Sequence, residues 1–139
     1  MFNWASISPD YFEKLCGELL EHSGFVNIEK LGGGGGDKGR DLLATKLHEP
    51  LPGSSRAEQW IIQCKRYTKK RLSKSEINGF LTASKEHKPD AVLIIHCGTV
   101  TSDVRDWLKV VEQEYAFQIH LWEERDLERE IRRHFKRLS

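Results

Sequence analysis

The stretch Ala91-Val-Leu-Ile-Ile-His-Cys97 decides the fold class of this chain. The run from Val92 to Ile95 is continuously apolar, which predicts a strand buried on both faces, as is typical of parallel sheets. Apolar residues at helical spacing over residues 73–86, and again after Thr101, predict a helix on each side of this strand. Because strands joined through helices favour parallel neighbours, the second half of the chain predicts an α/β arrangement.

The first half of the chain predicts one helix followed by three strands in an antiparallel meander. Ser8 and Pro9 favour a helix start, and Gly24 favours its end. The expected strands of the whole chain lie at residues 25–31, 41–46, 59–67, 91–97 and 117–121. A last helix is expected from about Glu124. We therefore expect a single α/β domain over residues 1–139, with a mixed five-stranded sheet flanked by helices in the order αβββαβαβα.

Composition places the chain among soluble globular domains. Of its 139 residues, 31% are charged and 38% hydrophobic, which excludes the disordered and membrane-spanning classes. The three cysteines, Cys16, Cys64 and Cys97, are never at CxxC spacing, so neither a zinc site nor a disulfide framework is indicated. The N-terminus has no basic region followed by an apolar stretch. We expect a cytoplasmic protein.

Two short segments carry the chemistry. Asp41 follows a glycine run at the start of one expected strand, and Gln63, Cys64 and Lys65 end an apolar run on the next. An acid on one strand and a polar-x-lysine triplet on its neighbour is typical of a metal-dependent site that cleaves phosphodiester bonds. The metal needs anionic oxygens, and the attacking water needs a neighbouring cation.

A basic run follows this triplet. Between Gln63 and Lys74 the chain carries no acid, and its six basic residues are Lys65, Arg66, Lys69, Lys70, Arg71 and Lys74. Such a patch can attract a polyanion although the net charge is only +1. A solvated loop is the plain alternative. Further on, Thr101 and Ser102 could contact a phosphate at a helix N-terminus, although helix capping alone explains them.

The glycine run suggests a rival function. Gly34, Gly36 and Gly39 formally fit a dinucleotide-binding fingerprint, but the following residues predict a strand where that fingerprint requires a helix. The Lys-Ser/Thr pair that ends a phosphate-binding P-loop is also missing. Nucleotide binding is therefore disfavoured. The run is interpreted either as a flexible approach to Asp41 for a nucleic-acid backbone or as a plain linker.

Four fragments in order resemble one known family. They are Phe12-Glu13 with Leu15, Leu19 and Gly24-Phe25; Asp37-Lys-Gly-Arg-Asp41; Gln63-Cys-Lys65-Arg66-Tyr67; and Thr99-Val-Thr101-Ser102. The chain resembles the Mrr-like restriction endonuclease family, within the PD-(D/E)xK nuclease superfamily, over roughly residues 9–127. The resemblance implies a restriction-endonuclease-like core and magnesium-dependent cleavage of DNA.

The resemblance also implies residue roles. Asp41 matches the central metal-binding aspartate, and Glu13 matches the acid that the family carries on its first helix. Gln63 matches the variant in which an amide replaces the usual second acid. The backbone carbonyl of Cys64 is expected to point toward the metal, and Lys65 to orient and help deprotonate the attacking water. This interpretation requires the four side chains to gather around one pocket.

The expected function is thus that of an endonuclease that needs Mg²⁺ or Mn²⁺ and cuts double-stranded DNA, in restriction or antiviral defence. A homodimer, or assembly through other domains of a longer protein of which this is the N-terminal effector, would allow both strands to be cut. The residues expected to bind DNA are Arg66, Lys69, Lys70, Arg71, Lys74, Thr101 and Ser102.

Three alternatives stay open. Gln63 in place of an acid also suits an inactive module that binds DNA or a partner protein. Glu13 could be an ordinary solvated helical residue. Asp37 could be a further metal ligand, although Asp37-Lys-Gly is also good turn chemistry.

Overall fold

A computed structural model of the protein describes residues 2–31 and 41–135. The glycine run and Asp37, with the expectations attached to them, lie outside these described residues. The elements are η1 (Trp4–Ser6), α1 (Pro9–His22), β1 (Phe25–Lys30), β2 (Leu42–His48), β3 (Arg56–Lys65), α2 (Lys74–Lys85), β4 (Ala91–His96), α3 (Ser102–Val111), η2 (Glu112–Glu114), β5 (Gln118–Trp122) and α4 (Glu124–His134). The expected order αβββαβαβα is confirmed, with two short 3₁₀ helices added.

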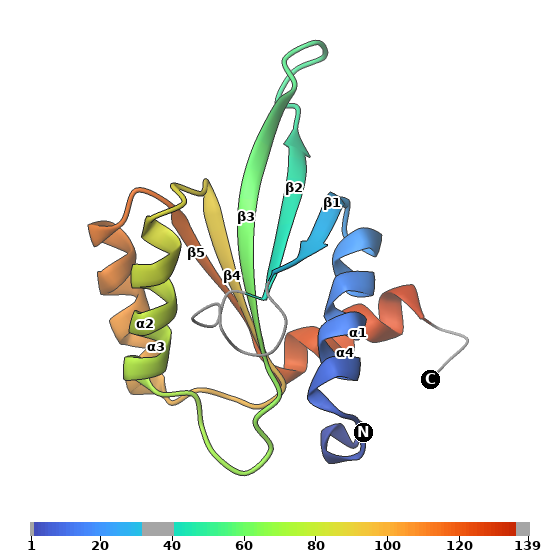
Figure 1. The fold of residues 1–139 in the computed structure, drawn as a ribbon, viewed down its shortest axis with the longest axis vertical. Coiled ribbons are helices and arrows are strands. Elements are labelled where there is room, and N and C mark those ends of the chain that lie inside the picture. Colours follow the sequence, from blue (N-terminus) through green and yellow to red (C-terminus); the bar gives the residue numbers. More distant parts are fainter. Residues whose placement is uncertain (1, 32–40, 136–139) are drawn as a thin grey trace.

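The five strands form one mixed sheet in the order β1-β2-β3-β4-β5. β1, β2 and β3 pair antiparallel, whereas β3, β4 and β5 pair parallel. Seen along the sheet, α1 and α4 lie on one face and α2 and α3 on the other (Figure 1). The expected α/β sheet flanked by helices is therefore confirmed, and β4 is buried at all six positions, as its apolar run predicts.

Two apolar clusters fill the space between the sheet and its helices. Ile62 packs with Phe12 of α1 in one cluster, while its neighbour Ile61 packs with Phe80 of α2 in the other. Successive side chains of a strand point to opposite faces. Gln63 and Lys65 therefore share the α2–α3 face with Ile61.

Capping side chains determine where three helices begin. The Ser8 hydroxyl accepts a hydrogen bond of 3.1 Å from the Tyr11 N–H at the start of α1. Ser73 and Glu76 form a reciprocal capping box at α2. The Thr101 hydroxyl accepts a hydrogen bond of 3.2 Å from the Val104 N–H at α3. Loss of such a cap typically costs about 1 kcal/mol.

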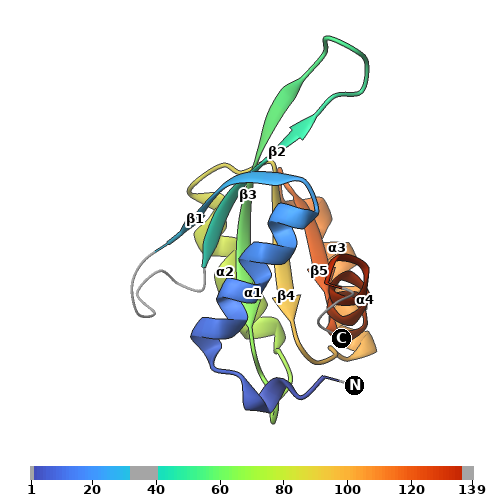
Figure 2. The same cartoon turned by 90° about the vertical axis from the view of Figure 1, so that its right-hand side faces the viewer.

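The hairpin of β2 and β3 projects beyond the rest of the molecule (Figures 1 and 2). β3 begins at Arg56, three positions before the expected Gln59, because Arg56 pairs with His48 in the β2–β3 register. β1 also departs from a simple alternation. Asn27 has a positive φ of 51°, and the register shifts between Val26 and Glu29, so Ile28 packs against the same apolar cluster as Phe25.

The helices of residues 2–31 and 41–135 are all too short or too polar to span a lipid bilayer.

Candidate functional site

Asp41 lies at the point where β2 begins and is held against the main chain of β3. One of its carboxylate oxygens accepts a hydrogen bond of 2.6 Å from the Cys64 N–H. Its own N–H donates to the Ile62 carbonyl at 2.9 Å. The Asp41 side chain thus serves as the acceptor for a β3 amide. This fixes a carboxylate beside the backbone that links Gln63 to Lys65.

The same contact sets the direction of the Cys64 carbonyl. In an extended strand, the N–H and C=O of one residue point to the same side. Because the Cys64 N–H is directed at Asp41, its carbonyl faces that side as well. The next carbonyl, of Lys65, faces β4 and accepts a hydrogen bond of 3.3 Å from the Cys97 N–H. The backbone therefore has the orientation that a carbonyl ligand beside Asp41 would need.

Gln63 is buried near the end of β3. In the β2–β3 register Leu42 lies opposite Ile62, and Gln63 is the next residue of β3. The residue is only 2% exposed, and its side-chain oxygen is buried without a hydrogen-bond partner among the described residues. An unsatisfied buried polar group costs about 1–3 kcal/mol. The Gln63 oxygen is therefore an acceptor for which the described part of the chain supplies no donor.

Glu13 reaches this region from α1, which covers the opposite face of the sheet. Its carboxylate lies 3.9 Å from the Lys30 ammonium. Burial raises the pKa of Glu13, the nearby charge of Asp41 raises it further, and Lys30 lowers it. One Glu13 oxygen is buried and makes no hydrogen bond within the described ranges. The charge of Asp41 is thus one cause of the raised Glu13 pKa, after burial.

The four expected site residues thus come from two sides of the sheet. By strand alternation Gln63 and Lys65 share the α2–α3 face, whereas Asp41 lies just before β2. Glu13 lines a hollow of about 350 Å³ on the α1 face, together with Leu42 and residues of α1 and β1. A single pocket on one face does not describe this arrangement. Asp41, Gln63 and Lys65 lie at the end of the sheet where β2 starts and β3 stops.

Lys65, at the end of β3, is held by an aromatic ring. Its ammonium lies 5.5 Å from the centroid of the Tyr67 ring. The Tyr67 hydroxyl in turn donates a hydrogen bond to Glu76 on α2. In the sequence, Tyr67 stands out only as the last residue of the motif that begins at Gln63. Alternate side chains of an extended chain lie on the same side, so the position of Tyr67 two residues after Lys65 could have indicated the contact.

The donor atoms near Asp41 have the chemistry of a hard-cation site. Two carboxylates, an amide oxygen without a donor and a main-chain carbonyl are all oxygen ligands, which Mg²⁺ and Mn²⁺ prefer. A divalent cation between Glu13 and Asp41 would also offset the repulsion that raises the Glu13 pKa. Within the described ranges, no three His, Cys, Asp or Glu side chains cluster as a metal site. The donors are therefore compatible with a divalent ion only if amide, carbonyl or water oxygens complete the set.

The basic residues after β3 differ in whether their charges are paired with an acid. Lys69, Lys70 and Arg71 are exposed on the loop between β3 and α2. Lys74 makes an ion pair of 2.8 Å with Asp103 at the start of α3. The pairing leaves the three loop residues as the more available charges.

The remaining expected DNA contacts also have internal roles. Arg66 donates a hydrogen bond of 3.3 Å to the Trp4 carbonyl and so ties β3 to the N-terminal segment. Thr101 caps α3, whereas Ser102 is exposed at the first turn of that helix.

The cysteines belong to the core. A hydrogen bond with Cys16 and burial raise the pKa of the Cys64 thiol well above its usual range. Burial raises the pKa of Cys97 to about 11. Thiols of this kind are poor nucleophiles at neutral pH. This agrees with the interpretation of Cys64 as a structural side chain.

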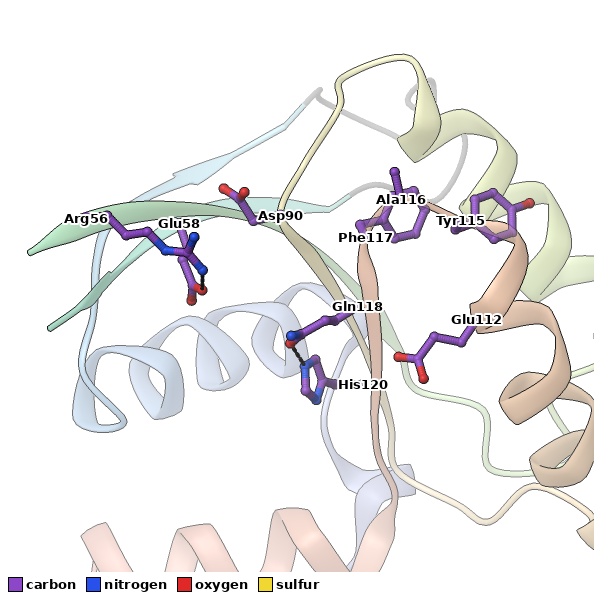
Figure 3. A pocket seen from close by; sticks show the side chains of 9 residues that line it. All are labelled: Arg56, Glu58, Asp90, Glu112, Tyr115, Ala116, Phe117, Gln118 and His120. Carbon is purple, nitrogen blue, oxygen red and sulfur yellow. Dashed lines mark hydrogen bonds and ion pairs between the residues drawn. The ribbon is translucent and has the colours of Figure 1, made fainter. Parts of the chain in front are cut away.

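A second cavity, of about 590 Å³, lies at the other end of the sheet (Figure 3). Its acids already have partners in the chain. Asp90 accepts a hydrogen bond of 2.8 Å from the Gln59 N–H, and Glu112 one of 2.7 Å from the Ile119 N–H. These carboxylates bind backbone N–H groups of β3 and β5. We assign the cavity a structural role.

One comparison with known proteins found a match. The Mrr family model, described as a restriction endonuclease, matches residues 4–131, which include every strand of the sheet. No curated protein and no solved structure matches the chain significantly. The chain belongs to the Mrr-like restriction endonuclease family.

Proposed function

We propose that this restriction-type nuclease hydrolyses phosphodiester bonds of duplex DNA and depends on a divalent metal. The observation that carries the proposal is the hydrogen bond of 2.6 Å between the Asp41 carboxylate and the Cys64 N–H. It places an acid beside the main chain of the Gln63-Cys64-Lys65 triplet. Metal-assisted hydrolysis needs such anionic oxygens to hold the ion.

Four groups of this chain would hold the metal, Mg²⁺ or Mn²⁺. They are the carboxylates of Asp41 and Glu13, the side-chain oxygen of Gln63 and the backbone carbonyl of Cys64. Among the described residues, one side-chain oxygen of Gln63 and one of Glu13 have no hydrogen-bond partner, and the Glu13 oxygen lies 3.9 Å from the Lys30 ammonium; these two oxygens support the assignment. When bound, the ion would polarise the scissile phosphate and lower the pKa of an attacking water.

Lys65 would act on that water and on the phosphate. Its ammonium would orient the water, help to remove its proton and offset the charge that develops on the phosphate oxygens. A flexible stem with a compact charge suits this role. The main chain at Lys65 is fixed from β4, because its carbonyl accepts a hydrogen bond of 3.3 Å from the Cys97 N–H.

The exposed cations after β3 would position the DNA. Lys69, Lys70 and Arg71 would contact phosphates, with Arg66, Lys74, Thr101 and Ser102 at the flanks. Contacts of this kind fix the register of a strand and make affinity depend on salt, but they carry little sequence information. A site of this type cuts one strand. We therefore infer that two copies act together, as a homodimer or through further domains.

The proposal is tested by cleavage of supercoiled plasmid in Mg²⁺. Asp41→Asn and Lys65→Ala should each lower the rate of nicking by on the order of a hundredfold or more. Lys109→Ala, which removes an exposed lysine of α3, is the matched control and should cut normally. EDTA should stop the unaltered protein. Undiminished nicking by Asp41→Asn would overturn the assignment.

A second candidate function is a nuclease-like module that binds DNA or a partner protein without cutting. The neutral amide of Gln63, where most members of the superfamily have an acid, favours it. Titration with Mn²⁺ in a calorimeter separates the two. A catalytic site should take up the ion in the unaltered protein and lose it in Asp41→Asn, whereas a pure binder need not bind it at all.

We further infer a role for the single domain of residues 1–139 in restriction or antiviral defence, as the cutting unit of a system whose other parts recognise the target. The family membership supports this role.

A further inference from the structure

We propose that Tyr67 is a positioning residue for Lys65, and that its ring holds the lysine ammonium at the end of β3. This inference rests on the proposed function of Lys65. The ring centroid lies 5.5 Å from the Lys65 ammonium and 4.4 Å from that of Lys70. Both distances are in the range of cation–π attraction. One aromatic ring therefore serves a lysine of the triplet and a lysine of the exposed loop.

The ring itself is fixed from two other elements. Its hydroxyl donates a hydrogen bond to Glu76 of α2, and Glu76 is held in turn by the capping box with Ser73. On the β4 side, the edge of the ring meets His96, with centroids 6.1 Å apart and planes at 77°. Burial raises the pKa of Tyr67 to about 12, with help from Glu76, so the hydroxyl remains a donor at neutral pH.

The buried histidine connects this ring to the backbone of Lys65. His96 is 1% exposed, and burial lowers its pKa, so the imidazole is neutral at pH 7. Its Nδ1 lies 3.3 Å from the Lys65 carbonyl oxygen. Gly98 keeps room for this imidazole, because a Cβ there would lie 3.0 Å from the His96 Nε2. The backbone of Lys65 is thus secured by β4 and its side chain by Tyr67.

This arrangement suits a lysine that must act on a reacting oxygen. A long lysine side chain samples many rotamers, and ordering them during the reaction would slow it. A salt bridge to a carboxylate would order the side chain but also neutralise its charge. The face of an aromatic ring attracts the ammonium and leaves its protons free for other partners. Glu76 remains engaged by the Tyr67 hydroxyl and by Ser73.

The experiment compares Tyr67→Phe with Tyr67→Leu. Phenylalanine keeps the ring, whereas leucine removes it and stays apolar. In single-turnover cleavage with saturating protein, Tyr67→Leu should lower the rate constant by about tenfold, whereas Tyr67→Phe should stay within about threefold. Tyr115→Leu is the matched control, since this half-buried tyrosine packs on Phe117 at 4.9 Å, away from the triplet. It should cut at the unaltered rate.

A second readout does not depend on cleavage. The ε-methylene protons of Lys65 should show an upfield ring-current shift in the NMR spectra of the unaltered protein and of Tyr67→Phe, and lose it in Tyr67→Leu. An active unaltered protein whose Tyr67→Leu variant cuts equally fast at saturation overturns this inference alone. Retention of the Lys65 shift in Tyr67→Leu overturns it as well. Failure of the unaltered protein to cut DNA under any divalent metal counts against the proposed function instead.

Discussion

The carboxylate of Asp41 replaces a backbone carbonyl as the acceptor for the Cys64 N–H, at 2.6 Å. The pairing of β2 and β3 begins at Leu42, and the Asp41 side chain adds a hydrogen bond just beyond the end of that ladder. The same atoms therefore stabilise the sheet and build the candidate metal site. Stability and activity should respond differently to substitutions here, which makes the two roles separable.

Two substitutions of Asp41 should distinguish the role of its charge in activity from the role of its hydrogen bond in stability. Asp41→Ala removes the acceptor of a part-buried N–H, so the free energy of unfolding should fall by about 1–3 kcal/mol. Asp41→Asn keeps an oxygen for that bond and should lose less stability, although both variants should be inactive. Urea denaturation gives the stabilities, and equal losses for the two variants would argue against the hydrogen bond.

Glu13→Gln should make the metal-free protein more stable at pH 7. Burial and Asp41 raise the pKa of Glu13, so the fold favours its protonated form. The resulting penalty is absent below the unfolded pKa and develops as pH rises through the folded pKa. In EDTA, Glu13→Gln should therefore unfold at higher urea than the unaltered protein at pH 7, with little difference at pH 3. Saturating Mg²⁺ should reverse the order at pH 7, since only the carboxylate binds the ion well. A metal-free variant that is less stable at pH 7 would contradict the account.

The loop charges should appear in the salt dependence of DNA binding. Each phosphate contact contributes about 0.9 to the slope of log affinity against log salt concentration. Lys69→Ala and Arg71→Ala should each reduce the slope by about that amount for any duplex sequence. Anisotropy titrations between low and moderate salt measure it. Lys109→Ala should leave the slope unchanged, and an equal change for this control would remove the specific role of the loop.

The hydrogen bond between Tyr67 and Glu76 should make the free energy of unfolding depend on pH in the acidic range. Burial alone would raise the pKa of Glu76, but the hydrogen bonds from Tyr67 and Ser73 lower it overall. Its contribution to stability is therefore present above the unfolded pKa of 4.5 and is lost as pH falls through the folded pKa. Tyr67→Phe should cost about 1 kcal/mol at pH 7 and clearly less near pH 3. A cost that does not change with pH would contradict this.

The sequence predicted the elements well because their signals are local. Ser8 and Pro9 mark the start of α1, and the apolar run of β4 leads to a strand buried on both faces. Where pairing with a neighbouring strand determines the structure, the predicted strands differ from those observed. β3 starts at Arg56 because this residue pairs with His48 across the hairpin, and the register of β1 shifts beside Asn27, which has a positive φ.

The site was predictable in its residues but not in its arrangement. Asp41, Gln63 and Lys65 follow from their sequence pattern and a resemblance, and alternation along β3 places Gln63 and Lys65 on one face. That Glu13 approaches from the other face depends on how α1 packs, which no spacing encodes. The contacts from Cys64 to Asp41 and from Tyr67 to Lys65 form only when the chain has folded. Only the structure reveals which backbone amide and which ring they use.

The most direct test of the central claim is a crystal structure in Mn²⁺ with anomalous scattering. The account predicts one peak within about 2.5 Å of both the Asp41 carboxylate and the Cys64 carbonyl oxygen, with a Glu13 or Gln63 oxygen completing the set directly or through water. A fully occupied Mn²⁺ at some other place, with Asp41 and the Cys64 carbonyl contacting protein alone, would contradict it.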